Sequence, residues 1–151
     1  MAGNRHGNRI WLRAAALAVT AAWIAFILLR SMKSGPQSHA ESTAVRGFLA
    51  RLLPRIDHHL LRKSAHFLEY LVLGGLLAAD FRLFGRRSLL PPMGCGLLVA
   101  ASDELLQRFV PARSGELMDV LLDFSGVAAG CLLLAGAAAL RRRRKGRRDG
   151  P

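Results

Sequence analysis

Ionisable side chains of both signs recur at helical spacing near the ends of strongly apolar segments of this sequence. The first such set comprises Lys63, His66, Glu69 and Tyr70. In a helix, Lys63, His66 and Tyr70 lie along one face, and Glu69 lies next to His66 at its edge. An imidazole beside a carboxylate can transfer protons, and a lysine can pair with an anionic group. This set could therefore serve either catalysis or recognition.

Two further sets of polar residues flank a short loop, residues 111–116. Before the loop, Asp103 and Gln107 are four residues apart and share a helix face, and Glu104 points about a quarter turn away. After the loop, two carboxylates are again four residues apart. Carboxylate oxygens are ligands that hard divalent ions accept. With the loop arginine, these residues are Asp103, Glu104, Gln107, Arg113, Asp119 and Asp123.

The elements that must position these residues are four apolar segments. The chain has 151 residues, 52% of them hydrophobic, yet its formal charge is +12 because basic residues lie between the apolar segments and in a terminal run. That length allows one domain, and a bilayer crossing needs about 20 apolar residues. We therefore predict an all-α fold, a polytopic bundle of four transmembrane helices. The predicted helices are residues 10–29, 64–81, 89–106 and 120–140.

The first apolar segment also has the basic start of a signal peptide. It ends in Leu28-Leu29-Arg30, without small residues at a cleavage spacing, so we favour a retained anchor after a cytoplasmic N-terminus, residues 1–9. Residues 30–62 form an external connection. Its second half, residues 43–61, has apolar residues at helical spacing and predicts an interfacial amphipathic helix interrupted near Pro54, with His58 and His59 included; a loop draped over the bundle is the alternative.

Orientation follows from the distribution of lysine and arginine, which favour the cytoplasmic side. The basic residues of 82–87 and of the tail 141–151 are compact, whereas those of the other side are spread over the long connection. We predict that both termini are cytoplasmic. All three polar sets then meet at the outer end of the bundle, and we expect no comparable group in its cytoplasmic half.

The basic tail and the small residues have structural interpretations. Next to an apolar segment, the tail is better suited to anionic lipid than to nucleic acid, so we predict no nucleic-acid partner. Cys95 and Cys131 lie inside apolar segments and suit packing. Gly126 and Gly130 have the spacing that lets another helix approach closely.

The three polar sets also form a joint pattern. It reads Lys63-x-x-His66-Phe67-x-Glu69-Tyr70-x-x-x-Gly74, then Ser102-Asp103-Glu104-x-x-Gln107-x-Phe109-Val110-Pro111-x-Arg113, then Asp119-Val120-x-x-Asp123-x-x-Gly126-x-x-x-Gly130.

In this order and spacing, the pattern resembles the VanZ-like family over about residues 60–131, which predicts a VanZ-like domain at residues 60–140. The resemblance implies a multi-pass protein of the bacterial inner membrane. It also implies a link to the cell envelope, because the founding member is associated with low-level teicoplanin resistance. Many relatives carry Asn where this chain has Asp123. One fold can serve many roles, so resistance itself does not follow.

Three functions compete. The one we favour is an accessory protein with an outward-facing polar pocket, in which Lys63, Arg113 and His66 pair with anionic groups of a lipid, an envelope precursor or the antibiotic. A membrane-embedded enzyme is the second, with His66 as general acid or base oriented by Glu69 or Asp103. A channel or carrier is the third, but a pathway needs polar residues along its whole length; a homo-oligomer would change that.

The sequence does not favour catalysis. It has no nucleophile-elbow pattern, no phosphate-binding glycine loop and no paired-cysteine metal site. We favour the binding of a divalent ion by the carboxylates even less than catalysis, and we predict no metal and no cofactor. The polar residues could also form a purely structural ion-pair network that joins the helix ends.

Overall fold

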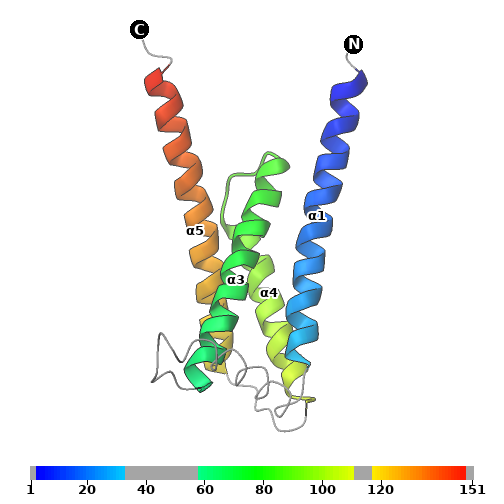
Figure 1. Cartoon of the computed structure of the whole chain (residues 1–151), viewed down its shortest axis with the longest axis vertical. Helices are drawn as coiled ribbons and strands as arrows, with labels where there is room; N and C mark the ends of the chain where they lie inside the picture. Colours follow the sequence, from blue (N-terminus) through cyan, green and yellow to red (C-terminus); the bar gives the residue numbers. More distant parts are fainter. Residues whose placement is uncertain (1–2, 33–57, 111–116, 149–151) are drawn as a thin grey trace, which may run out of the picture.

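The computed structural model describes residues 3–32, 58–110 and 117–148, and in these ranges it is all-helical (Figure 1). The described helices are α1 (Gly3–Ser31), α3 (His58–Leu83), α4 (Leu90–Gln107) and α5 (Leu117–Arg148). Each contains most or all of one predicted apolar segment. The prediction of an all-α fold is confirmed.

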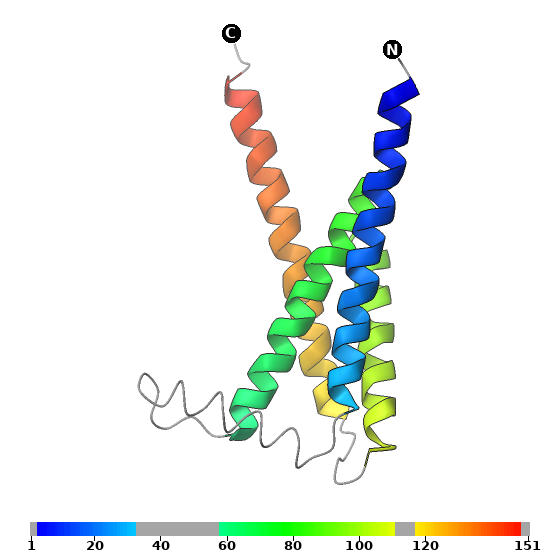
Figure 2. The same ribbon diagram turned by 45° about the vertical axis from the view of Figure 1, so that its right-hand side comes forward.

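The helices run alternately up and down, so both chain termini lie at the same end of the molecule (Figures 1 and 2). We call this the terminal end. The turn between α3 and α4 faces the same way, while the opposite, distal end holds the end of α1, the start of α3, the end of α4 and the start of α5. Helix α3 contacts the other three helices, and α1 contacts α3 and α4 but not α5 within the described ranges.

Local sequence explains how the α3–α4 turn forms. Gly85 has a φ of 79°, a left-handed conformation that costs glycine little. Its N–H donates to the Arg82 carbonyl at 2.9 Å, and the Arg86 N–H donates to the Phe81 carbonyl at 2.9 Å. These two bonds are the Schellman pattern that ends a helix. Two prolines then occupy the first turn of α4, where a missing backbone N–H is tolerated.

Glycines let α3 and α5 pack backbone to backbone. A Cβ atom on Gly126 would lie 2.6 Å from the Phe67 carbonyl oxygen, and one on Gly130 would overlap the Leu71 carbonyl oxygen. From the other side, Gly74 lies against the backbone of Val127. The close approach of α3 and α5 therefore depends on the absence of side chains at these positions.

Burial is inverted in comparison with a water-soluble helical protein. Asp103, Glu104 and Gln107 are buried in the bundle, whereas Leu90 and Leu98 on the same helix are 80% and 70% exposed. Helix α3 shows the same inversion, because Glu69 is buried while large apolar side chains such as Leu60 and Leu68 are exposed. A soluble helix buries its apolar stripe and exposes its charged face. The surface of this bundle is thus apolar and much of its interior is polar.

Two of the described helices are long and apolar enough to cross a membrane, Gly7–Ser31 and Leu117–Arg147. They contain the predicted segments 10–29 and 120–140. The predicted segments 64–81 and 89–106 lie within or along α3 and α4, whose polar residues lower their mean hydropathy.

Several helices extend beyond the predicted segments. Helix α1 begins at Gly3, seven residues before the predicted start at residue 10. Helix α5 continues through the basic tail to Arg148, because arginine and lysine are strong helix formers. His58 to Leu61 begin α3, although the sequence grouped them with the interfacial segment. The rest of that segment, up to residue 57, lies outside the described residues.

Candidate functional site

The three polar sets predicted from sequence come together at the distal end of the bundle. We call this group the polar cluster, and α3, α4 and α5 each contribute to it. Arg113, which was predicted to belong to it, lies outside the described residues. The cluster consists of Lys63, His66, Glu69, Tyr70, Asp103, Glu104, Gln107, Asp119 and Asp123.

The rim of the cluster is formed by partly exposed groups of both signs. The Lys63 Nζ atom lies 2.8 Å from the Asp119 Oδ1 atom, and their side chains are 29% and 27% exposed. This ion pair joins the first turn of α5 to α3. His66 lies one turn deeper on α3, with its side chain 20% exposed. The rim is therefore accessible to a ligand, although its lysine and aspartate already form an ion pair with each other.

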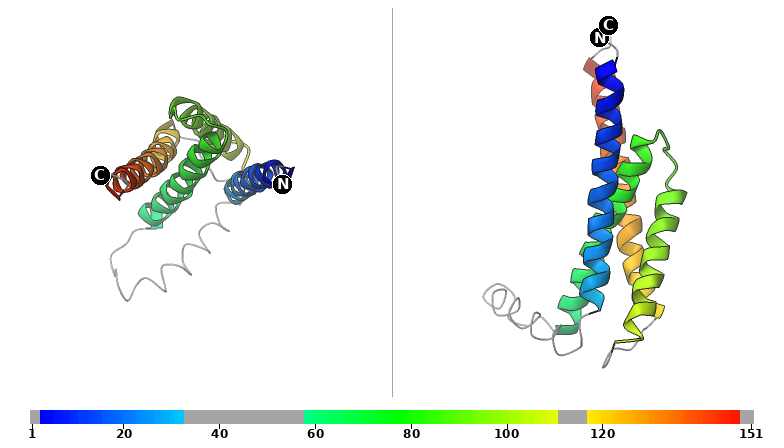
Figure 3. Two further views of the ribbon diagram at one scale, coloured as in Figure 1. Left: turned by 90° about the horizontal axis from the view of Figure 1, so that it is seen from above. Right: turned by 90° about the vertical axis from the view of Figure 1, so that its right-hand side faces the viewer.

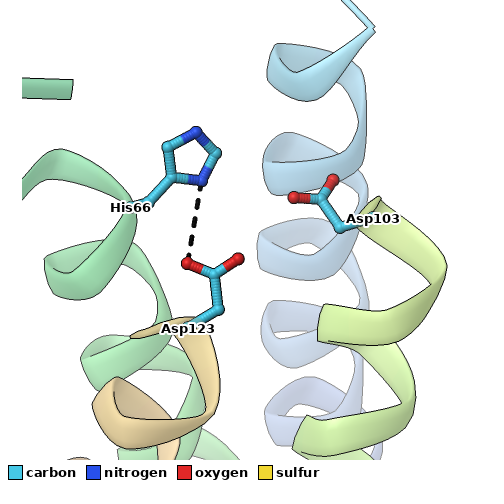
Figure 4. A group of neighbouring side chains, drawn as sticks. All are labelled: His66, Asp103 and Asp123. Atoms are coloured by element: carbon cyan, nitrogen blue, oxygen red, sulfur yellow. Dashed lines mark ion pairs between the residues drawn. The ribbon is translucent and has the colours of Figure 1, made fainter. Parts of the chain in front are cut away.

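Below the rim, His66 faces two carboxylates (Figure 4). Its Nδ1 atom lies 4.0 Å from Asp123 Oδ1, and the Asp123 side chain is 2% exposed. Asp103 is fully buried and points toward the same space from α4. One nitrogen or oxygen atom from each of these three residues lies within 4.8 Å of the others. We call His66, Asp103 and Asp123 the floor of the cluster.

Neighbouring groups hold the floor in place. Gln107 donates from Nε2 to Asp103 Oδ2 at 3.3 Å, as their four-residue spacing allows. The side chain of Tyr70 is completely buried near Asp103 and Asp123. Glu104, which the spacing placed a quarter turn away, is also buried, at 4% exposed, because α4 is covered on both of these faces by its neighbours.

Helix α1 supplies a part of the site that sequence reasoning missed. Arg30 forms an ion pair with Glu69, and the Trp23 Nε1–H donates to the Glu69 carbonyl at 3.0 Å. These two contacts connect Glu69 to α1, and the orientation of His66 by Glu69 or Asp103 stays a prediction. The sequence contained a sign of this pair, because Arg30 follows the end of the first apolar segment and Glu69 lies near the start of the second, so both belong to the same end of the bundle.

A second buried polar contact lies nearer the terminal end. Thr20 Oγ1 donates to Asp80 Oδ2 at 2.7 Å, and both residues are buried. This half of the bundle therefore holds a buried polar pair, in addition to what the sequence predicted, which was the absence of a group comparable to the polar cluster. Asp80 falls inside a predicted span and Thr20 faces it from another, so the type of residue alone could have drawn attention to them.

The polar cluster has more carboxyl groups than basic groups among the described residues. Its five carboxylates meet two ion-paired cations among the described residues, Lys63 and Arg30, besides His66. A buried charge is costly unless another charge or a hydrogen bond compensates it. The arrangement is thus suited to a cation at its floor, to proton transfer through His66, or to a ligand that presents charge at the rim.

Comparison with known proteins gives one match. The family model described as VanZ/LLP1 matches residues 16–139, which include parts of all four described helices. No curated protein and no solved structure matches the chain.

Proposed function

Because the chain belongs to the VanZ/LLP1 family, we propose that it is a multi-pass protein of the bacterial inner membrane, with four spans, whose polar cluster binds the charged head group of a lipid or a lipid-linked envelope precursor. This assignment combines the family with the chemistry of the distal end. A link to teicoplanin resistance is part of the proposal through the family resemblance alone.

The inverted burial of α3 and α4 carries the proposal of four spans. Their exposed leucines suit lipid tails, and their buried carboxylates face other helices, as ionisable residues in membrane helices do. In water the same helices would expose a continuous apolar surface far larger than soluble proteins tolerate. The two most apolar helices, α1 and α5, provide the remaining spans.

The charge at the terminal end supports cytoplasmic termini. There, Arg82 and Arg87 of the α3–α4 region and Arg141 and Arg142 of α5 line a common hollow. Basic residues concentrate on the cytoplasmic side of membrane proteins, where anionic lipids attract them. With that side inside the cell, the polar cluster lies at the outer surface, where envelope precursors are assembled into the wall.

The graded exposure of the cluster supports binding of a head group. Lys63 and His66 present nitrogen atoms at the rim, which can pair with a phosphate or carboxylate of the ligand. The Lys63–Asp119 pair would have to open or share its charge with the ligand, so a mixed-charge head group fits it best. The apolar surface of the neighbouring helices would hold the lipid tail.

Native mass spectrometry of the protein extracted in mild detergent tests this function. We expect co-purified lipid on the unmodified chain and a loss of at least about tenfold in its occupancy on substituting both Lys63→Met and His66→Gln. Arg9→Met and Arg86→Met, two exposed arginines at the terminal end that do not line the basic hollow, form the matched control. Equal lipid occupancy in all three proteins would refute head-group binding at the cluster.

The contact between His66 and Asp123 favours a second candidate, a membrane-embedded enzyme acting on a lipid-linked substrate. A carboxylate near Nδ1 leaves Nε2 to accept or deliver a proton. Product analysis of the purified protein with lipid-linked precursors tests it, and turnover that survives His66→Gln would exclude His66 as the acid or base.

A further inference from the structure

We infer that His66, Asp103 and Asp123 form a binding site for one divalent transition-metal ion, to which α3, α4 and α5 each contribute one ligand (Figure 4). The ion would sit at the floor of the polar cluster. This inference goes beyond head-group binding and does not depend on it, because it concerns a different ligand and two buried carboxylates that the head-group proposal does not use; His66 is the one residue that both proposals share.

The distances permit such a site. One donor atom from each residue lies within 4.8 Å of the other two. Bonds from zinc to nitrogen or oxygen are about 2.0–2.2 Å long, so two ligand atoms on one tetrahedral ion lie about 3.4 Å apart and never more than about 4.4 Å apart. Small rotations of the three side chains would therefore bring them around one ion, without movement of the helices.

The position of Asp123 points independently to a missing cation. Its side chain is 2% exposed, and Oδ1 has no hydrogen-bond partner within the described ranges, its nearest opposite group being His66 at 4.0 Å. In Figure 4 this oxygen is directed at the imidazole, and the second carboxylate oxygen of Asp123 lies on the side of Asp103. A deeply buried carboxylate oxygen needs a compensating partner, and a metal ion between the three side chains provides one.

The donor set decides the class of metal. One imidazole with two carboxylates suits zinc, manganese or iron, whereas magnesium and calcium prefer oxygen ligands alone. Three protein ligands also leave a coordination position open, and the partial exposure of His66 places that position toward the rim. The bond from Gln107 to Asp103 gives this ligand the supporting contact that metal-bound carboxylates usually have.

Calorimetric titration with ZnCl2 and with MnCl2 tests the site in the detergent-purified full chain after treatment with a chelator. The chain has five histidines, so the four others, His6, His39, His58 and His59, are first replaced by alanine and the affinity tag contains no histidine. We expect one bound ion per chain. His66→Ala and Asp123→Asn should each weaken its binding by at least about tenfold.

Asp80→Asn, a buried carboxylate at the other end of α3, provides the matched control and should leave metal affinity unchanged. Circular dichroism checks that each variant is folded, and metal-induced thermal stabilisation of the parent protein, absent in His66→Gln, gives a second readout if Asp123→Asn does not fold. Failure of the folded parent to bind either metal, or equal binding by the folded variants, would overturn the site. Lipid occupancy measured separately shows whether head-group binding survives that result.

Discussion

Thr20 and Asp80 join α1 to α3 through a 2.7 Å hydrogen bond between two buried side chains. Helix α1 makes its remaining polar contacts with α3 at the distal end, through Arg30 and Trp23. The first helix is therefore fastened to α3 at two levels, although a long connection separates the two in sequence. Figure 3 shows α1 beside α3 from two further directions.

A double-mutant cycle should measure the first of these fastenings. Thr20→Val removes the donor and Asp80→Ala removes the acceptor of this hydrogen bond, and we expect a coupling free energy of roughly 1 kcal/mol, as for other hydrogen bonds between membrane helices. Reversible unfolding in detergent gives the free energies of unfolding for the four proteins. Strictly additive effects would mean that the two side chains do not interact.

Substitution of the glycines should separate α5 from α3. Gly130→Ala places a methyl group against the Leu71 carbonyl and should destabilise the protein by about 1–3 kcal/mol. Gly136→Ala on the same helix meets no atom within 4 Å, so it is the control and should be neutral or stabilising. Thermal unfolding of both variants distinguishes them, and equal melting temperatures would contradict the packing.

Removal of Arg30 should leave the Glu69 carboxylate, 10% exposed, without its cation. We expect Arg30→Ala to cost about 1–3 kcal/mol of stability, and Arg30→Ala with Glu69→Gln to recover part of it, because the uncompensated charge is gone. The exposed Arg9→Ala at the other end of α1 controls for loss of positive charge. A double variant less stable than Arg30→Ala would argue against charge compensation.

Cysteine labelling should locate the polar cluster with respect to the membrane. Leu117 at the distal end and Ser88 in the α3–α4 turn are both exposed, and each can be replaced by cysteine in a chain with Cys95→Ala and Cys131→Ala. In spheroplasts, a maleimide that cannot cross membranes should label position 117 at once and position 88 only after permeabilisation. The reverse pattern would place the cluster in the cytoplasm and remove the basis for head-group binding from outside.

Periodicity and topology were enough to predict the helices and the convergence of three polar sets. Apolar segments that cross a layer one after another run in alternate directions. The start of the second segment, with His66, and the end of the third, with Asp103, therefore lie on the same side. Asp103 and Gln107 were predicted to share a helix face, and the hydrogen bond between their side chains agrees with this prediction. These inferences need the period of the helix and the order of segments, and nothing more.

The pairing of individual charges could not be predicted in the same way. For Glu69 the spacing indicated only His66 on its own helix, whereas the ion pair with Arg30 depends on the rotation of α1 about its axis. Similarly, Asp123 rather than Asp119 lies beside His66, because the glycine contacts fix how far α5 is shifted along α3. The rotation of a helix and its shift along a neighbour are set by packing between helices, and they cannot be inferred from the spacing of residues along one helix.

The unequal lengths of the helices have a consequence for the surrounding lipid. Helix α4 has 18 residues, which span only about 27 Å, whereas α1 and α5 have 29 and 32. A bilayer of ordinary thickness, about 30 Å in its hydrocarbon part, would have to thin beside α4 to match it. In the proposed four-span arrangement, head-group binding should therefore be strongest in membranes of short acyl chains and weaken as the chains lengthen. Fatty-acid composition would then act as a control on this protein without any dedicated regulator.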